Sequence, residues 1–593
     1  MWLSSLSQSR RTVLLCVVLG LAVLAAYANH FYNDLHFDDL DAVRNNPAIR
    51  DLHNIPRFFV DPTLFSRAEN QYLYRPITSV SLAVDYWLGD GSLFYFHLST
   101  FLWYLVQLLL MFFLFRRIMD LADPHPSNIW TALLATMCYG LHPANAETVN
   151  YVIQRADLYN TLGTIACLWL FVRYPGQRKF GWYLLPAVAA ILAKPPALIF
   201  PLMLLIYVFL FERQGKGTRK WVGAIRTVAP ALLVVGALAW LLAQMRSPTW
   251  SPKADSPFPY WVTQPFVALH YFKSFFLPTE LAVHAGWPYL GLFSLKAVAG
   301  YLFVLLMLGG AYLTARRPDT RPIAFGILWF FVALLPTSLM ALREVTNDHR
   351  MFFPFVGLTL SVFWACRLAL FRKTARLTSG RRWQYAALSA VVLILLAGAV
   401  GTRQRNRVWF TDEGLWRDST RKNPNAPDGW INLGDVFLRQ GDYEAALPYY
   451  QRAIAVRPLY STAEMGLARI YVGLHRDAEV EEHLRRTLIS LHGAEAAVIY
   501  VVLANWLESK GRPDDSIHAL ESAQQADPRA VEVRHAFLTA YSKRQDWPAL
   551  ERVARETLRL KPDDELAASC LSASLDSQGR KTSGPPVDAA GHR

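Results

Sequence analysis

Long apolar runs alternate with short charged segments between residues 12 and 402. Most of these runs are long enough to cross a bilayer as an α-helix, which needs about 20 mainly apolar residues. The pattern predicts an all-α membrane bundle of about 11 spans. The predicted spans are residues 12–28, 97–115, 129–141, 158–172, 182–192, 197–211, 222–244, 292–313, 322–342, 351–370 and 385–402.

The pattern changes after the last apolar run, where apolar residues thin out to helical spacing and charged residues become frequent. Trp430, Leu433, Gly434 and Phe437 stand at the spacing of a tetratricopeptide repeat. Four prolines follow the 34-residue period of that repeat: Pro424 and Pro458, then Pro528 and Pro562. The sequence therefore predicts an α-solenoid of stacked helix pairs after the bundle.

These patterns predict three parts. Residues 1–403 form the transmembrane domain, and residues 404–575 form the tetratricopeptide-repeat domain. The last segment, residues 576–593, is rich in Gly, Pro, Ser and charge, and we expect it to be disordered.

Basic residues gather in alternate loops between the apolar runs, as in Arg10-Arg11 before the first run and Arg116-Arg117 after the second. Because Lys and Arg are enriched on the cytoplasmic side, the N-terminus is predicted to be cytoplasmic and the first run to be a retained anchor. This clustering accounts for the net charge of +14, so nucleic-acid binding is not expected. Residues 261–277, which His270 and Lys273 interrupt, are predicted to lie in the outer interface without spanning.

Polar residues collect at the outward ends of the predicted spans. Asp38 and Asp39 lie just outside the first span, and Glu147, Arg155 and Asp157 lie between two short spans. Charges at membrane depth usually face a bundle interior or a water-filled cavity and are candidates for function. A structural ion pair between Glu147 and Arg155 is the alternative interpretation.

Several other kinds of site lack a signal in the sequence. The five cysteines are scattered, four of them in apolar runs, so neither a metal site nor a disulfide framework is expected. A Gly-rich phosphate loop of the nucleotide-binding type is also absent from the sequence, which disfavours a nucleotide-sugar donor. We therefore expect no metal and no cofactor.

A series of short motifs, in order along the chain, resembles a known family. The motifs are Phe37-Asp38-Asp39, Asn45-Asn46-Pro47, Tyr74-Arg75-Pro76 through Trp87, His142-Pro143 with Glu147, Arg155 and Asp157, Ala193-Lys194, Trp329-Phe330 with Leu335 to Ser338, and His349-Arg350 through Pro354. Over most of its length the chain resembles the transmembrane and tetratricopeptide-repeat O-mannosyltransferases and their bacterial relatives, within the GT-C superfamily. It departs from the family at Pro195 and His349, where a glutamate is common.

The resemblance implies transfer of a sugar from a polyprenyl phosphate to a protein hydroxyl on the far side of the membrane. By similarity, Asp38 or Asp39 is the base that takes the hydroxyl proton. Positive charge is needed at the leaving phosphate. The residues expected there are Arg350 first, then Arg155, Arg75, Lys194 and His349, with Glu147 and Asp157 in support. The expected partners are the lipid-linked sugar, an acceptor protein held by the repeats, and the bilayer.

Alternative functions stay open at this stage. The chain could be a non-catalytic membrane scaffold that displays the repeats, or a glycosyltransferase acting on lipid or cell-surface polysaccharide. A transporter is less favoured, because the polar groups gather on one face and do not cross the bilayer. The short loops favour a bacterial inner membrane, with the site and the repeats facing the periplasm.

Overall fold

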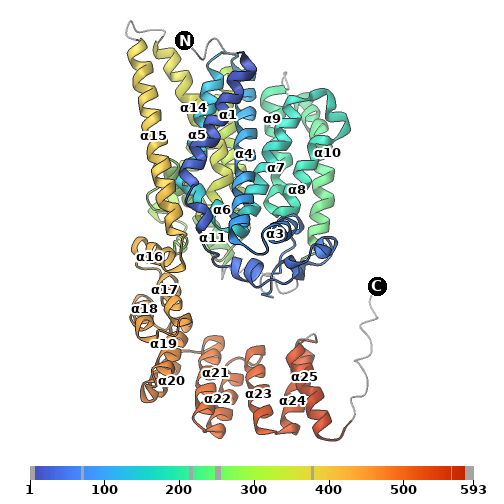
Figure 1. Cartoon of the computed structure of the whole chain (residues 1–593), viewed down its shortest axis with the longest axis vertical. Helices are drawn as coiled ribbons and strands as arrows, with labels where there is room; N and C mark the ends of the chain where they lie inside the picture. Colours follow the sequence, from blue (N-terminus) through green and yellow to red (C-terminus); the bar gives the residue numbers. More distant parts are fainter. Residues whose placement is uncertain are drawn as a thin grey trace. The chain divides into compact units, whose positions relative to one another are not determined.

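The computed structural model describes residues 7–68, 72–212, 218–246, 256–374, 380–562 and 564–580. The chain divides into two compact units, Met1–Lys422 and Asn423–Arg593. Every regular element in the described residues is helical (Figure 1), so the predicted all-α fold is confirmed. The division falls after Lys422, later in the chain than the domain boundary expected from the sequence.

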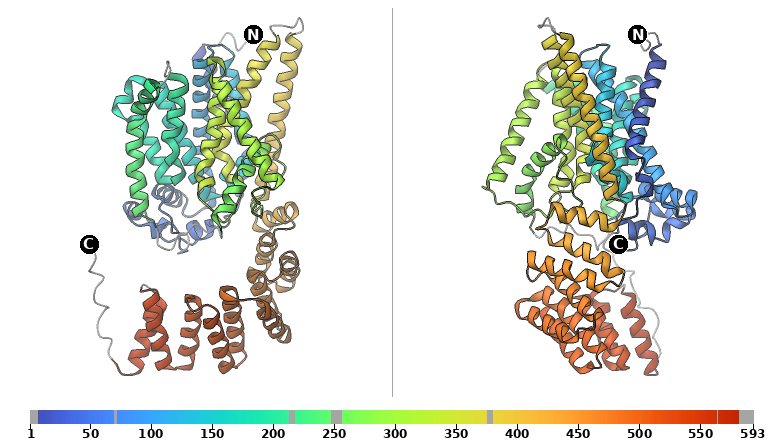
Figure 2. Two further views of the ribbon diagram at one scale, coloured as in Figure 1. Left: turned by 180° about the vertical axis from the view of Figure 1, so that it is seen from behind. Right: turned by 60° about the vertical axis from the view of Figure 1, so that its left-hand side comes forward.

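Eight helical segments of the first unit, counted over the described residues, are long and apolar enough to cross a membrane. Figure 2 shows them running side by side in one bundle. They are α1 (Gln8–Tyr27), α4 (Leu93–Ala122), the segment Pro195–Glu212 that contains α9 (Phe200–Tyr207), α10 (Thr218–Gln244), α12 (Leu295–Ala315), α13 (Arg321–Leu339), α14 (Phe352–Thr374) and α15 (Gly380–Val408).

Three other predicted spans form helices that are too short or too polar to meet both criteria. They are α5 (Asn128–Gly140), α7 (Arg155–Arg173) and α8 (Leu185–Ala193). The first two turns of α7 carry Asp157 and Asn160, and both side chains are buried. Because α7 packs against α4 and α8, these side chains meet protein and not lipid. A helix inside the bundle can therefore be less apolar than one that faces the bilayer.

Two glycines allow α13 and α14 to approach closely. A Cβ atom added to Gly326 would lie 2.2 Å from the Gly357 carbonyl oxygen, and one added to Gly357 would lie 2.4 Å from the Gly326 carbonyl oxygen. Small residues at such contacts let helix backbones come together within a bilayer. This contact fixes α14, which directly follows the predicted site residues His349 and Arg350.

A buried polar joint ties the start of the chain to its last span. Asn33 donates through Nδ2 to the Asn406 carbonyl oxygen at 3.0 Å, and Asn150 donates to the Asn406 side-chain oxygen at 2.7 Å. His30 forms a 2.9 Å hydrogen bond with Asn150. All four side chains are buried, and buried polar groups are nearly always paired in this way. The joint brings together the segment after α1, helix α6 (Ala146–Asn150) and α15.

The second unit is a series of paired helices, as the repeat pattern predicts. The Tyr450 ring fits between two of them because Gly434 and Gly466 carry no side chain; a Cβ added to Gly466 would lie 1.8 Å from that ring. The predicted tail begins at the end of the last helix, and residues 581–593 lie outside the described part. The helices are α17 (Pro427–Arg439), α18 (Tyr443–Val456), α19 (Ser461–Gly473), α20 (Asp477–Ser490), α21 (Gly493–Ser509), α22 (Pro513–Ala526), α23 (Val531–Arg544), α24 (Trp547–Leu560) and α25 (Glu565–Ser577).

Candidate active site at one end of the membrane bundle

Asp38 and Asp39 lie in a tight turn between η2 (His30–Tyr32) and η3 (Leu40–Arg44). The preceding residue, Phe37, has a φ of +52°, a left-handed conformation that is unusual for a bulky side chain. The turn sends the two neighbouring carboxylates into different surroundings.

Asp39 points into the protein. Its side chain is buried, and its carboxylate oxygens accept the backbone N–H groups of Val152 and Ile153 at 3.1 and 2.7 Å. Burial raises the pKa of Asp39 to about 7, although these amide hydrogen bonds pull it down. Asp39 therefore anchors the turn to η9 (Val152–Gln154), the short helix that precedes α7.

Asp38 is exposed to solvent, in contrast to its neighbour. Its pKa is nevertheless raised above the ordinary value, because protein lies close around the carboxylate; the charges of Arg75 and Lys194 oppose this effect. An exposed carboxylate with a raised pKa can accept a proton from a hydroxyl that reaches it.

Lys194 follows the last residue of α8 and directs its ammonium group at two acceptors. Its Nζ atom donates to Asp157 at 2.6 Å and to the Gln154 side-chain oxygen at 2.9 Å. Burial lowers the pKa of Lys194, and the charge of Asp157 opposes that change. The charges of Arg75 and Arg350 also act on Lys194, so three cations lie within electrostatic range of one another.

Glu147, on α6, is buried and has His349 as a partner. The imidazole Nδ1 atom lies 2.7 Å from the Glu147 carboxylate. Burial raises the pKa of Glu147, whereas the nearby charges of Arg405 and Arg350 lower it. Arg350 directs its Nη1 atom at two carbonyl oxygens of the preceding loop, at 2.9 and 3.3 Å, and this leaves other N–H donors of the guanidinium for a ligand.

Arg75 precedes α3 (Pro76–Gly89) and is partly buried. Its guanidinium lies over the Phe65 ring, 5.4 Å from the centroid. Burial lowers the pKa of Arg75, and the carboxylates of Asp157 and Asp38 oppose this change. Within the described residues no hydrogen bond or ion pair engages the guanidinium, so its donors can bind an anion.

Arg155 occupies a different position. Its guanidinium is fully buried, forms an ion pair with Asp85 and donates to the Phe96 carbonyl oxygen at 2.7 Å. Since Glu147 pairs with His349, the alternative of a Glu147–Arg155 ion pair is wrong. A single carboxylate inside the otherwise uncharged segment before Trp87 is the signal that could have pointed to Asp85.

Most of the predicted site residues thus share one charged cluster. Gln154 joins the cluster through Lys194 and was not foreseen from the sequence. No group of three or more His, Cys, Asp or Glu side chains in the described ranges is arranged to hold a metal ion. The charged cluster consists of Asp38, Arg75, Glu147, Asp157, Lys194, His349 and Arg350.

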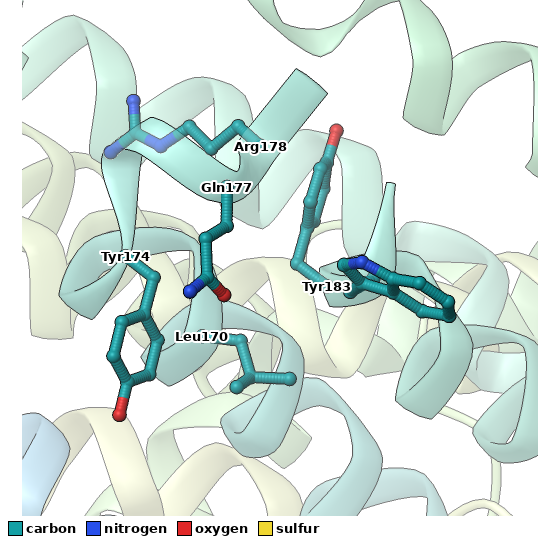
Figure 3. A pocket seen from close by; sticks show the side chains of 6 residues that line it. Leu170, Tyr174, Gln177, Arg178 and Tyr183 are labelled. Atoms are coloured by element: carbon teal, nitrogen blue, oxygen red, sulfur yellow. The ribbon is translucent and has the colours of Figure 1, made fainter. Parts of the chain in front are cut away.

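A small hollow lies at the other end of α7 and is not part of the charged cluster. Since α7 has 19 residues, about 28 Å separate its two ends. Arg178, which lines the hollow, donates two hydrogen bonds to the Glu212 carboxylate, at 2.9 and 2.5 Å. The residues that line it are Leu170, Tyr174, Gln177, Arg178, Trp182 and Tyr183 (Figure 3).

The fold and the charged cluster define an integral-membrane helical protein that carries a tetratricopeptide-repeat solenoid. The tetratricopeptide-repeat family matches residues 427–459. Among curated proteins, the chain is similar to protein O-mannosyl-transferase Tmtc3 of Drosophila melanogaster, with 23% identity over 91% of this chain and 66% of the relative. Human TMTC3 is 22% identical over 88% of this chain and 60% of its own length.

A third relative is protein O-mannosyl-transferase F38B6.6 of Caenorhabditis elegans, with 22% identity over 77% of this chain and 64% of the relative. The predicted resemblance to the transmembrane and tetratricopeptide-repeat O-mannosyltransferases is therefore confirmed. The chain spans less than two thirds of the length of each of these relatives.

Among solved structures, the tetratricopeptide-repeat protein YrrB matches 28% of this chain and 85% of its own, at 15% identity and a TM-score of 0.22. That score is too low to bear on the fold.

Proposed function

We propose that the chain is an integral-membrane glycosyltransferase that moves mannose or another hexose from a polyprenyl phosphate to a Ser or Thr hydroxyl of a protein. The observation that carries the proposal is the charged cluster, in which the exposed carboxylate of Asp38 lies near Arg75 and Lys194, and Arg350 lies near Lys194. The names of the relatives, which are protein O-mannosyl-transferases, support the reaction class.

In the proposed reaction Asp38 accepts the proton of the acceptor hydroxyl. The hydroxyl oxygen forms a bond to the anomeric carbon as the bond from that carbon to the phosphate oxygen breaks. The phosphate leaves with the bonding electron pair, and its developing charge needs fixed positive charge nearby.

Asp38 is assigned as the base in preference to Asp39. The Asp39 carboxylate is buried and engaged by the two amides of Val152 and Ile153. The exposed Asp38 is the one that a substrate hydroxyl can reach. We assign Asp39 the role of holding the turn in its conformation.

The phosphate-binding role is assigned to Arg75 and Arg350, with Lys194 beside them. Both guanidinium groups keep N–H donors for an anion, and a guanidinium matches two phosphate oxygens at once. Arg155 is engaged by Asp85, so we assign it a structural role. His349 is proposed to hold Glu147 in place at the edge of the site.

The repeats are proposed to hold an extended segment of the acceptor protein, since stacked helix pairs form concave surfaces of this kind. The positive-inside pattern supports a site and repeats that face away from the cytoplasm. In a bacterium that orientation places both in the periplasm, with the bundle in the inner membrane.

The test is transfer in liposomes that contain the purified full chain, radiolabelled polyprenyl-phosphate mannose or glucose, and a membrane-free protein extract. We expect label on protein Ser or Thr residues with wild type and its loss with Asp38→Asn. Asp34→Asn is the matched control, because Asp34 lies in the same loop in an exposed ion pair with Arg44. Equal labelling by wild type and Asp38→Asn would refute the assignment of the base. Absence of labelling with every lipid-linked hexose would refute the proposed reaction.

A further inference from the structure

The turn that carries Asp38 needs an external support. It lies outside the long helices, and the left-handed backbone of Phe37 persists only where the surrounding structure holds it. Asp39 supplies one anchor, through the amides of Val152 and Ile153. A second anchor holds His36 and Phe37, the two residues that come directly before Asp38 in the sequence.

Phe37 is held by a set of aromatic rings that come largely from the C-terminal end of the first unit. Its ring centroid lies 5.2 Å from that of Trp416 with the planes at 89°, and 6.2 Å from that of Trp409 at 79°. Tyr151 closes the set at 5.4 Å. Edge-to-face contacts of this kind are favourable and directional, so they fix the orientation of the Phe37 ring.

His36 is held at both of its nitrogen atoms by the same part of the chain. Nδ1 lies 2.6 Å from an Asp412 carboxylate oxygen, and Nε2 lies 2.7 Å from the Trp409 carbonyl oxygen. The imidazole is fully buried. Asp412 is the first residue of α16 (Asp412–Lys422), and Trp416 lies one turn later on that helix. One short helix therefore contacts both residues that precede Asp38.

The helix α16 is itself fixed to the bundle. Arg405, on α15, donates to Asp418 at 2.5 Å. Lys422 donates to Asp418 at 2.8 Å and to the Leu281 carbonyl oxygen at 2.6 Å. Since the chain continues from Lys422 directly into the repeats, α16 is the last element of the first unit.

We propose that α16 is a positioning element for Asp38, with Trp416 and Asp412 as its positioning residues. This inference rests on the proposed function in that it takes Asp38 as the base. The two contacts hold Phe37 and His36, and these set where the Asp38 carboxylate points. Loss of either contact is expected to lower kcat by misplacing the base and to leave KM for the lipid-linked sugar near its wild-type value. The contacts described for Trp416 and Asp412 hold Phe37 and His36, and neither of these residues belongs to the charged cluster.

The first arm of the test is hydrogen exchange, which does not depend on activity. In Trp416→Ala we expect about tenfold faster exchange at the amides of Val152 and Ile153, which the turn protects through Asp39. Trp416→Phe keeps an aromatic ring and is expected to keep most of the protection. The matched control is Trp364→Ala, a buried Trp on α14 whose Nε1 atom donates to the Asp319 carbonyl oxygen. Unchanged exchange in Trp416→Ala would overturn the inference whether or not the chain transfers sugar.

The second arm is kinetic. We expect kcat to fall about 10- to 100-fold in Trp416→Ala and Asp412→Asn, with KM for the donor within about twofold of wild type. Asp412→Glu is expected to recover part of the rate. If wild type transfers sugar and both variants keep its kcat despite faster exchange, the positioning role is wrong. If wild type transfers none, the proposed function fails, and the exchange arm alone decides whether α16 holds the turn.

Discussion

The imidazole of His349 and the carboxylate of Glu147 lie 2.7 Å apart, although 202 positions separate them in the chain. The contact joins η15 (Asp348–Met351), which leads into α14, to α6. It also places an imidazole at position 349, where the family resemblance described above led us to expect a glutamate. Two carboxylates there would repel each other, so the His349–Glu147 pair is a different and internally consistent arrangement.

The two carboxylates of the Asp38–Asp39 pair are expected to respond differently to loss of charge. Asp38→Asn should slow transfer by about 10²–10⁴-fold with little change in thermal stability, because it removes the proton acceptor. Asp39→Asn should lower the unfolding temperature, because the two backbone N–H groups bind different carboxylate oxygens and Asn replaces one of these oxygens with an NH2 donor. Transfer rates and melting curves in detergent would check both. Loss of transfer in Asp39→Asn with unchanged melting would reverse the assignment.

The pH dependence of kcat/KM should carry the signature of Asp38. The base must be deprotonated, so the rate falls on acidification; because the pKa of Asp38 is raised, the fall occurs at a higher pH than for an ordinary Asp. Arg75 favours the charged form of Asp38, so Arg75→Gln should move the acidic limb to still higher pH. Lys194→Met should move it the same way by less. Arg57→Gln, an exposed change in the first loop, serves as the control. An acidic limb at the same pH in Arg75→Gln would exclude the electrostatic coupling.

The Arg155–Asp85 ion pair should matter for stability more than for chemistry. Arg155→Met leaves the Asp85 carboxylate buried without its partner, and we expect a loss of about 3–5 kcal/mol in the free energy of unfolding. The double variant Arg155→Met/Asp85→Leu removes both charges and should recover most of that loss. Thermal unfolding of the four members of this mutant cycle measures the coupling. Additive effects of the two substitutions would show that the residues do not interact.

A tight helix contact in the second unit gives a further prediction. Gly466→Ala forces a Cβ atom against the Tyr450 ring, and we expect a cost of about 1–3 kcal/mol in the stability of the repeats. Gly176→Ala, which meets no atom within 4 Å, should be neutral. Hydrogen exchange of α18 and α19 amides measures the change. Equal protection in Gly466→Ala and wild type would show that the ring can move aside at no cost.

The sequence predicted the helical class and the repeats because both depend on local patterns. Continuous apolar runs identify helices that face lipid, and a fixed period identifies stacked helix pairs. The apolar pattern alone identifies α7 less clearly, since a helix inside the bundle is free to carry Asp157 and Asn160. The hydropathy of a helix in the bundle depends on whether the helix faces lipid or other helices.

The membership of the charged cluster could also be anticipated, whereas its pairings could not. Span ends on one side of a membrane share one surface, so Glu147, Lys194 and Arg350 were expected near one another. Which carboxylate meets which cation depends on how the helices pack. The Arg155–Asp85 pair joins positions 70 residues apart, and no local spacing encodes it.

The contacts of the first loop with α15 and α16 bear on how the protein is made. His36 finds its partners at Trp409 and Asp412, and Asn33 finds one at Asn406, all more than 370 positions later in the chain. During synthesis the first loop is therefore made long before the residues that hold it exist. The turn that carries Asp38 acquires its final shape only when the last span has been inserted. The site can therefore form only when the bundle is complete. In a nascent chain that stops before α15, the loop that carries Asp38 and Asp39 lacks the contacts that fix its conformation.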